Sequence, residues 1–117
     1  MSQAKVHREE IQEGGSNYSV VLIEAKNAYI VLLSEGEESL GTLAVSLPPK
    51  PGMVGPSLSS ILLGDRNTAL ARALAERLAN SMKRMILVSV FVKTLDDKKI
   101  MRIFLGLLEK ILKNMGT

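Results

Sequence analysis

The placement of proline is the sequence feature that most constrains how this chain can fold. All four prolines lie between residues 48 and 56, in the segment PPKPGMVGP. Proline has no backbone N–H to give to a sheet, so this segment cannot pair in a sheet interior. We interpret it as a stiff surface loop that presents Lys50, Met53 and Val54 to a binding partner, because recognition residues gather on loops held by rigid scaffolds. A plain connector is the alternative.

Before this loop, strand-like segments alternate with turn-like ones. Residues 18–25 and 28–34 are rich in apolar and β-branched side chains and are separated by Lys26 and Asn27, which predicts a hairpin. The mostly polar residues 6–12 predict a weak edge strand. Residues 40–47 alternate with a period of two, which is typical of a half-buried strand. Together these segments predict a meander of three or four antiparallel strands.

After the loop, the pattern changes to strand, helix, strand, helix. Residues 57–63 predict a strand, and the following helix, capped by Asp65 or Asn67, ends near Met82. Residues 85–92 are almost wholly apolar, which is typical of a central strand covered on both sides. The last helix follows Asp96 and Asp97. We therefore expect one α+β domain over residues 1–117, an antiparallel sheet of about six strands with two helices packed on it.

The last helix, from residue 98 to about 115, is apolar around much of its circumference. Beside its core stripe it carries a second stripe, formed by Met101, Leu105, Leu108 and Leu112. A surface helix normally shows a single apolar face, so a helix of this kind should be covered twice. We expect another subunit to supply the second cover. The second stripe is thus the predicted interface of a homodimer or a dimer of dimers.

The composition excludes most enzyme chemistry. The chain has no cysteine, which rules out disulfides, thiolate zinc sites and cysteine nucleophiles, and its one histidine, His7, cannot form a multi-histidine metal site. Neither a GxGxxG nor a P-loop pattern occurs. We interpret His7 as a surface residue and Asp96 and Asp97 as helix caps. The prediction is a binding protein with no catalytic residue, cofactor or metal.

The net charge of +3 is unevenly distributed along the chain. Residues 1–64 hold four Lys or Arg against seven Glu, whereas residues 65–117 hold eleven against five Asp or Glu. A basic half can attract nucleic acid or an acidic protein surface. Aromatic residues make up only 3% of the chain, which argues against the stacking platforms of nucleic-acid binders. No apolar run resembles a signal peptide or a membrane span, so we expect a cytoplasmic protein without a membrane partner.

A family resemblance rests on the order of three segments. These are SSILLGD at residues 59–65, ALARALAERLA at 69–79 and ILVSV at 86–90, preceded by LGTLAVSL at 40–47. The sequence resembles the proteasome assembly chaperone 3 and 4 family, and the Leu-Leu-Gly-Asp and Arg-Leu-Ala signatures favour the chaperone 4 branch. The resemblance covers about residues 18–113. The cysteine-free composition is compatible with an archaeal member.

The resemblance implies a non-catalytic chaperone. Members of the family form dimers, bind α subunits of the 20S proteasome and help the α ring to assemble. The eukaryotic members pair as unlike subunits, which leaves a second assembly chaperone open as a partner. No contact residue carries over from the motifs, because the signature residues belong to the core. Two rivals remain, a dimeric scaffold of the roadblock or longin type and a small basic nucleic-acid-binding module.

Overall fold

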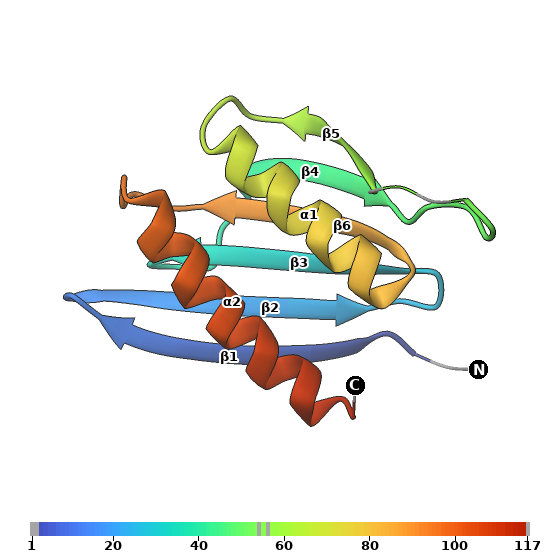
Figure 1. Ribbon diagram of the computed structural model, residues 1–117. Helices are drawn as coiled ribbons and strands as arrows, with labels where there is room; N and C mark the ends of the chain where they lie inside the picture. Colours follow the sequence, from blue (N-terminus) through green and yellow to red (C-terminus); the bar gives the residue numbers. More distant parts are fainter. Residues whose placement is uncertain (1–2, 54, 56, 117) are drawn as a thin grey trace.

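The protein is a six-stranded β-sheet with two α-helices on one face (Figure 1). The computed structural model describes residues 3–53, 55 and 57–116. The elements in chain order are β1 (Lys5–Glu13), β2 (Ser16–Glu24), β3 (Ala28–Glu35), β4 (Thr42–Leu47), β5 (Leu58–Leu63), α1 (Thr68–Met82), β6 (Met85–Phe91) and α2 (Asp97–Asn114). The predicted number, order and type of elements are confirmed, and so is the α+β class.

The pairing of the strands departs from the prediction. The sheet order is β1-β2-β3-β6-β4-β5, so β6 lies between β3 and β4. β1, β2 and β3 form the predicted antiparallel meander, but β4 pairs with β6 and β5 instead of continuing it. β6 runs parallel to β3, because α1 carries the chain across the sheet before β6 enters it. The sheet is therefore mixed and not purely antiparallel.

The core lies between the sheet and the two helices. α1 packs on β4, β5 and β6, whereas α2 packs on β1 and β2. A stripe of small residues on α1, formed by Ala71, Ala75 and Ala79, is fully buried and lets this helix lie close to the sheet. On the α2 side, the rings of Tyr18 and Phe104 meet edge to face with centroids 6.1 Å apart.

Two glycines permit close packing around β4, one against β6 and the other at the end of β5. A Cβ on Gly41 would lie 2.1 Å from the carbonyl oxygen of Val90 in β6, and the Gly41 N–H donates to Ser89 Oγ at 2.8 Å. Gly64 has a φ of +89°, and a Cβ there would lie 2.6 Å from Thr42 Oγ1. The Gly-Thr and Leu-Leu-Gly motifs that carry the family resemblance thus have a structural role in joining β4 and β5 to the sheet.

The helix caps follow the prediction at α2 but only partly at α1. Asp96 accepts hydrogen bonds from the backbone N–H groups of Lys98 and Lys99 at 3.1 and 3.2 Å, as expected for an N-cap. Asn67 is the N-cap of α1, but it adopts a left-handed conformation with φ 57° and makes no side-chain cap bond. The start of α1 is therefore predicted correctly, and the expected side-chain mechanism is wrong.

A buried carboxylate joins the meander to the end of β6. Glu35 is 7% exposed and accepts the backbone N–H groups of Lys93 and Thr94 at 2.9 and 2.8 Å, together with the Ser16 hydroxyl at 3.1 Å. Burial raises the pKa of this carboxyl, but the hydrogen bonds from Thr94, Lys93 and Ser16 outweigh it, and the pKa is lowered overall. Glu35 is consequently a structural anchor in its ionised form.

Candidate protein-binding surface

The face of the sheet opposite the helices carries an apolar row that crosses most of the strands. Strand pairing aligns side chains from neighbouring strands, and the row contains Val6, Ile23, Ile30, Leu87 and Val45. Within residues 3–53, 55 and 57–116, no helix or strand covers this face. β6 is central as predicted, but the chain covers only one of its two sides, and the expectation of double cover is not met within the described residues.

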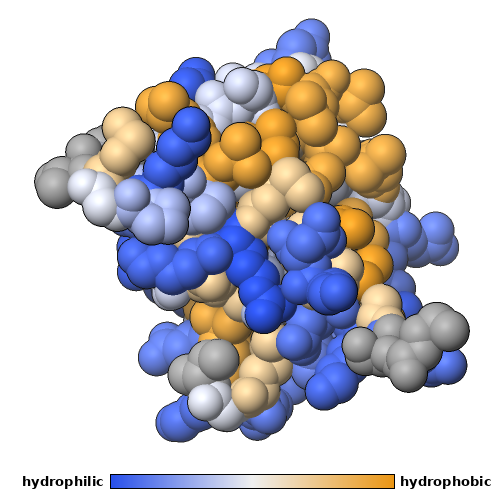
Figure 2. Space-filling model, turned by 90° about the vertical axis from the view of Figure 1, so that its right-hand side faces the viewer, coloured by the Kyte–Doolittle hydropathy of each residue, from blue (hydrophilic) through white to orange (hydrophobic). Residues whose placement is uncertain are grey.

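The most exposed part of this face lies at the β4–β5 end. Leu47 and Leu58 are cross-strand partners whose side chains are 59% and 80% exposed. Figure 2 shows hydrophobic side chains gathered at the upper right, on the side of the sheet away from the helices. Contiguous exposed apolar patches mark interaction sites on proteins. We call the uncovered side of the sheet, from Val6 to Leu58, the open sheet face.

The proline-rich loop borders this exposed end. A hollow of about 490 Å³ is lined by Leu47, Leu58 and Met85 and by the predicted loop residues Lys50 and Met53. We call this hollow the loop groove. The sequence-based choice of Lys50 and Met53 thus falls beside the most exposed apolar residues of the sheet, while Val54 lies outside the described residues.

A tight turn presents the two loop residues together. The Met53 N–H donates to the Lys50 carbonyl at 3.0 Å, and Gly52 between them has a φ of +84°. Proline at the second position and a positive-φ glycine at the third position are the signature of a type II β-turn. Met53 is 65% exposed at the end of this turn. The turn therefore presents the positively charged Lys50 and the flexible apolar side chain of Met53 next to the open sheet face.

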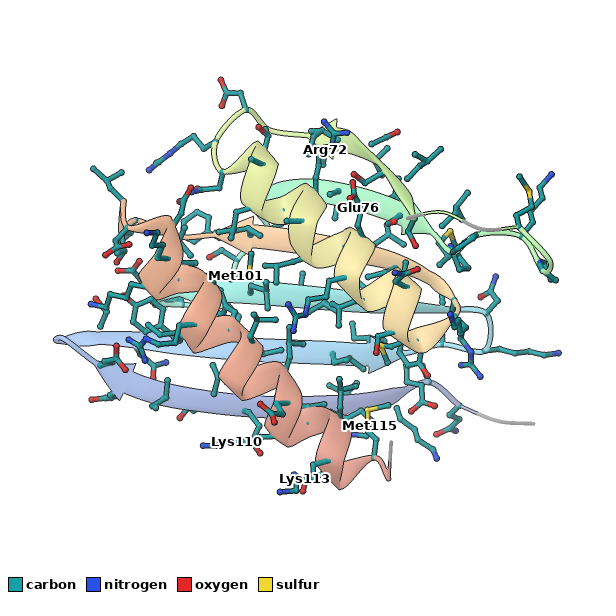
Figure 3. All side chains as sticks on the ribbon, viewed as in Figure 1. Arg72, Glu76, Met101, Lys110, Lys113 and Met115 are labelled. Carbon is teal, nitrogen blue, oxygen red and sulfur yellow. The ribbon has the colours of Figure 1, made fainter. Side chains whose placement is uncertain are left out.

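Polar contacts fix β5 against α1. Arg72 Nε donates to Ser59 Oγ at 3.0 Å, and the same hydroxyl bonds to the Glu76 carboxylate. Figure 3 shows both helix residues directed toward β5. Ser59 therefore bridges Arg72 and Glu76, which lie four residues apart on α1. This bridge holds the edge strand in place while leaving its leucines free for contact.

The predicted dimer stripe on α2 lies partly inside the protein. Leu108 is 2% exposed and belongs to the core, and Met101 and Leu105 are partly buried against the core. Leu105, Leu108 and Leu112 line a second groove of about 630 Å³ between α1 and α2. The chain itself thus buries part of the stripe that was expected to need a subunit. Its role as a dimer interface stays a prediction.

Some of the basic residues in the second half of the chain serve the fold. Arg102 Nη2 lies 2.6 Å from Glu13 Oε2, which ties α2 to β1, and this hydrogen bond lowers the pKa of Glu13. The guanidinium of Arg84 lies over the ring of Tyr29, 5.3 Å from its centroid. In contrast, Lys110 and Lys113 are exposed and lie on the lower part of α2, below the edge strand β1 in Figure 3. The exposed cations on α2 remain available to an acidic partner.

The described residues contain neither a candidate metal-binding cluster nor a helix that could cross a membrane. In that part of the chain, no group of three or more His, Asp or Glu side chains could hold a metal ion. His7 Nε2 lies 3.5 Å from Glu24 Oε1, and the imidazole is only 26% exposed, so this histidine is more buried than predicted. Neither described helix has the length and apolar character needed to cross a bilayer.

Comparison with known proteins supports the family resemblance that the order of the sequence motifs indicates. The proteasome assembly chaperone 4 family matches residues 17–92, from β2 to the end of β6. No curated protein matches the sequence. A chain from the crystal structure of a novel chaperone complex for yeast 20S proteasome assembly is 17% identical, aligns over 97% of this chain and 95% of its own length, and superposes with a TM-score of 0.66. That likeness establishes the fold, and the family match establishes the kinship. This chain belongs to the proteasome assembly chaperone 4 family.

Proposed function

We propose that this protein is a non-catalytic chaperone that binds 20S proteasome α subunits and assists assembly of the α ring as a homo-oligomer. Membership of the proteasome assembly chaperone 4 family supports a chaperone role. The observation that carries the proposal is the open sheet face next to the loop groove. β6 has the sequence of a strand covered on both sides, yet the described chain covers one side. This arrangement supports a second cover supplied by another molecule.

The two apolar features suit two different partners. The open sheet face is broad, and apolar sheet faces pack on each other at about 10 Å with their helices outside. We assign it to a second copy of the chain. The loop wall of the loop groove, where a turn presents Lys50 and Met53, is accessible beside the sheet, and we assign this wall to the α subunit. The basic half of the chain would speed the encounter with an acidic client surface.

Native mass spectrometry of the chain mixed with unassembled proteasome α subunits tests the proposal. We expect even-numbered oligomers of the chain and an additional mass for a chaperone–α-subunit complex. A homo-oligomer that ignores α subunits would contradict client binding and favour a scaffold of the roadblock or longin type. Steep, salt-dependent retention of unrelated DNA would favour the nucleic-acid module instead.

Replacement of residues 48–56 by a short Gly-Ser linker separates the two assignments. We expect binding of the α subunit to weaken by about tenfold or more, because the turn that presents Lys50 and Met53 is lost. The oligomer should persist, since the open sheet face is unchanged. Lys26→Glu, in the short exposed connection between β2 and β3, is the matched control and should leave affinity within about twofold. Unchanged affinity of the linker variant in a titration would refute the loop assignment.

A further inference from the structure

The groove between the two helices is a preformed apolar trough on the side of the molecule away from the open sheet face. α1 packs on β4–β6 and α2 on β1–β2, so the helix side of β3 lies beneath the gap between them. Tyr29 of β3, Leu78 of α1 and Leu108 of α2 form its floor, and each is at most 7% exposed. The floor therefore belongs to the packed core and does not have to form upon binding.

The walls of the groove are apolar and adaptable. Met82 of α1 faces the groove from one side, and Leu105 and Leu112 of α2 face it from the other. Met82 and Leu105 are only partly buried. The unbranched methionine side chain fills irregular spaces and adjusts to different neighbours. A partner could thus insert apolar side chains between the helices without disturbing the floor.

The lining of the groove carries a net positive charge. Arg77 and Lys113 line it from α1 and α2, and Arg84, which is not a lining residue, lies over the ring of Tyr29. Among the charged residues that line the groove, only Glu109 is acidic. Figure 3 shows Lys113 projecting outward from the lower part of α2. The electrostatic complement of such a lining is a partner that carries acidic side chains on both sides of an apolar stripe.

We propose that this inter-helix groove docks an amphipathic α-helix of a partner protein, with an apolar stripe flanked by Asp or Glu. A helix laid into a hydrophobic groove contacts it through side chains spaced three and four residues apart. Two flanking helices and an apolar floor fit this mode of recognition. The groove lies on the opposite side of the sheet from the open sheet face, so a helix bound there leaves the open sheet face accessible to a second copy of the chain. The protein would therefore hold a second partner while bound to its client.

Fluorescence anisotropy with two labelled peptides of about 15 residues tests the proposal. Both peptides carry the same leucine stripe at helical spacing, and one has Glu at the flanking positions where the other has Lys. We expect the Glu peptide to bind about tenfold tighter than the Lys peptide, with an advantage that shrinks as salt is added. Equal binding of the two peptides would overturn the proposal.

A double charge reversal locates the binding. Arg77→Glu with Lys113→Glu alters two exposed residues of the lining and should invert the preference, so that the Lys peptide binds tighter. Lys98→Glu with Lys110→Glu changes the net charge equally outside the lining and should leave the preference as it is. NMR spectra of each variant verify the fold, and shifts at Met82 and Leu105 should accompany binding. Shifts confined to the open sheet face, or dissociation of the oligomer by the charge reversal in the lining, would contradict the proposal.

Discussion

The two edges of the sheet are built from opposite kinds of residue. β1, with the sequence KVHREEIQE, is mostly charged or polar, and ion pairs tie Glu13 to Arg102 at 2.6 Å and Arg8 to Glu38 at 3.2 Å. β5, with the sequence LSSILL, has no charged residue, and its leucines at 58, 62 and 63 are at least 51% exposed. The same sheet thus ends in a charged edge on one side and in an apolar edge on the other.

This difference indicates where the protein avoids association and where it accepts it. Exposed edge strands tend to pair with other chains, and natural proteins protect them with charged side chains. β1 carries that protection on both faces. β5 lacks it and continues into the open sheet face through the Leu47–Leu58 pair. The β4–β5 end is therefore the less protected end of the sheet, which supports its proposed role as a contact surface.

The largest effect is expected where the β4–β5 end joins the rest of the sheet. Gly41→Ala would place a methyl group 2.1 Å from the Val90 carbonyl oxygen, which forces β4 and β6 apart. We expect a loss of about 3 kcal/mol or more in the free energy of unfolding, measured by urea denaturation. Gly106→Ala in α2 meets no atom within 4 Å and should instead stabilise the protein by up to about 1 kcal/mol. A small loss at Gly41 would mean that β4 and β5 adapt more readily than the packing indicates.

Charging the apolar edge should make it behave like β1. Leu47→Glu combined with Leu58→Glu removes two exposed leucines. Burial of each leucine in the proposed interface would contribute about 1.5–3 kcal/mol, so the dissociation constant of the proposed homo-oligomer should rise at least about 100-fold. Sedimentation velocity over a dilution series measures this change. Leu95→Glu, at an 85% exposed position between β6 and α2, is the control and should leave the oligomer intact. An unchanged oligomer in the double variant would contradict this assignment and favour the second stripe of α2 as the interface.

A smaller loss of stability is expected at Glu35, which joins the end of β3 to the segment that follows β6. Glu35→Gln keeps the shape of the side chain but removes the charge that accepts the N–H groups of Lys93 and Thr94, which should cost about 1–3 kcal/mol at pH 7. The pKa of Glu35 is lowered from 4.5 in the folded state, so this stabilisation is present above pH 4.5 and is lost as the pH falls through the folded pKa. The difference between the two proteins should therefore vanish in acid, as followed by urea unfolding at several pH values. A pH-independent difference would show that shape and not charge matters at this site.

Local patterns in the sequence predict the elements better than their arrangement. The alternation in β4, the apolar run of β6 and the capping Asp96 each depend on neighbouring residues, and all are confirmed. The position of β6 beside β3 depends on where α1 delivers the chain, and no local pattern encodes that. The run MILVSVF indicates a central strand in either direction, so parallel pairing with β3 was not foreseen.

The candidate surfaces show the same difference: features set by neighbouring residues are predicted, and features set by the arrangement of the elements are not. Proline and glycine identify the loop at Lys50 and Met53, because their backbone restrictions are local. The inter-helix groove was missed, since it arises from the separation of two helices that land on different strands. Its one signal in the sequence was the second apolar stripe of α2, which was interpreted as a subunit interface. The open sheet face was not predicted, because the apolar sequence of β6 is the same whether its second side is covered by its own chain or left uncovered.

Because β6 lies in the centre of the sheet but comes late in the chain, the sheet cannot be completed until late in synthesis. β1–β3 and the β4–β5 pair both leave the ribosome before β6, and they have no strand-to-strand contact with each other without it. Until residues 85–91 emerge, β3 and β4 each carry an unpaired backbone edge. The sheet is therefore closed from its centre by a late segment, and such non-local pairing is slow compared with the formation of a hairpin or a helix. A nascent chain stalled before β6 would be two separate pieces of sheet, each prone to pair with the wrong strand.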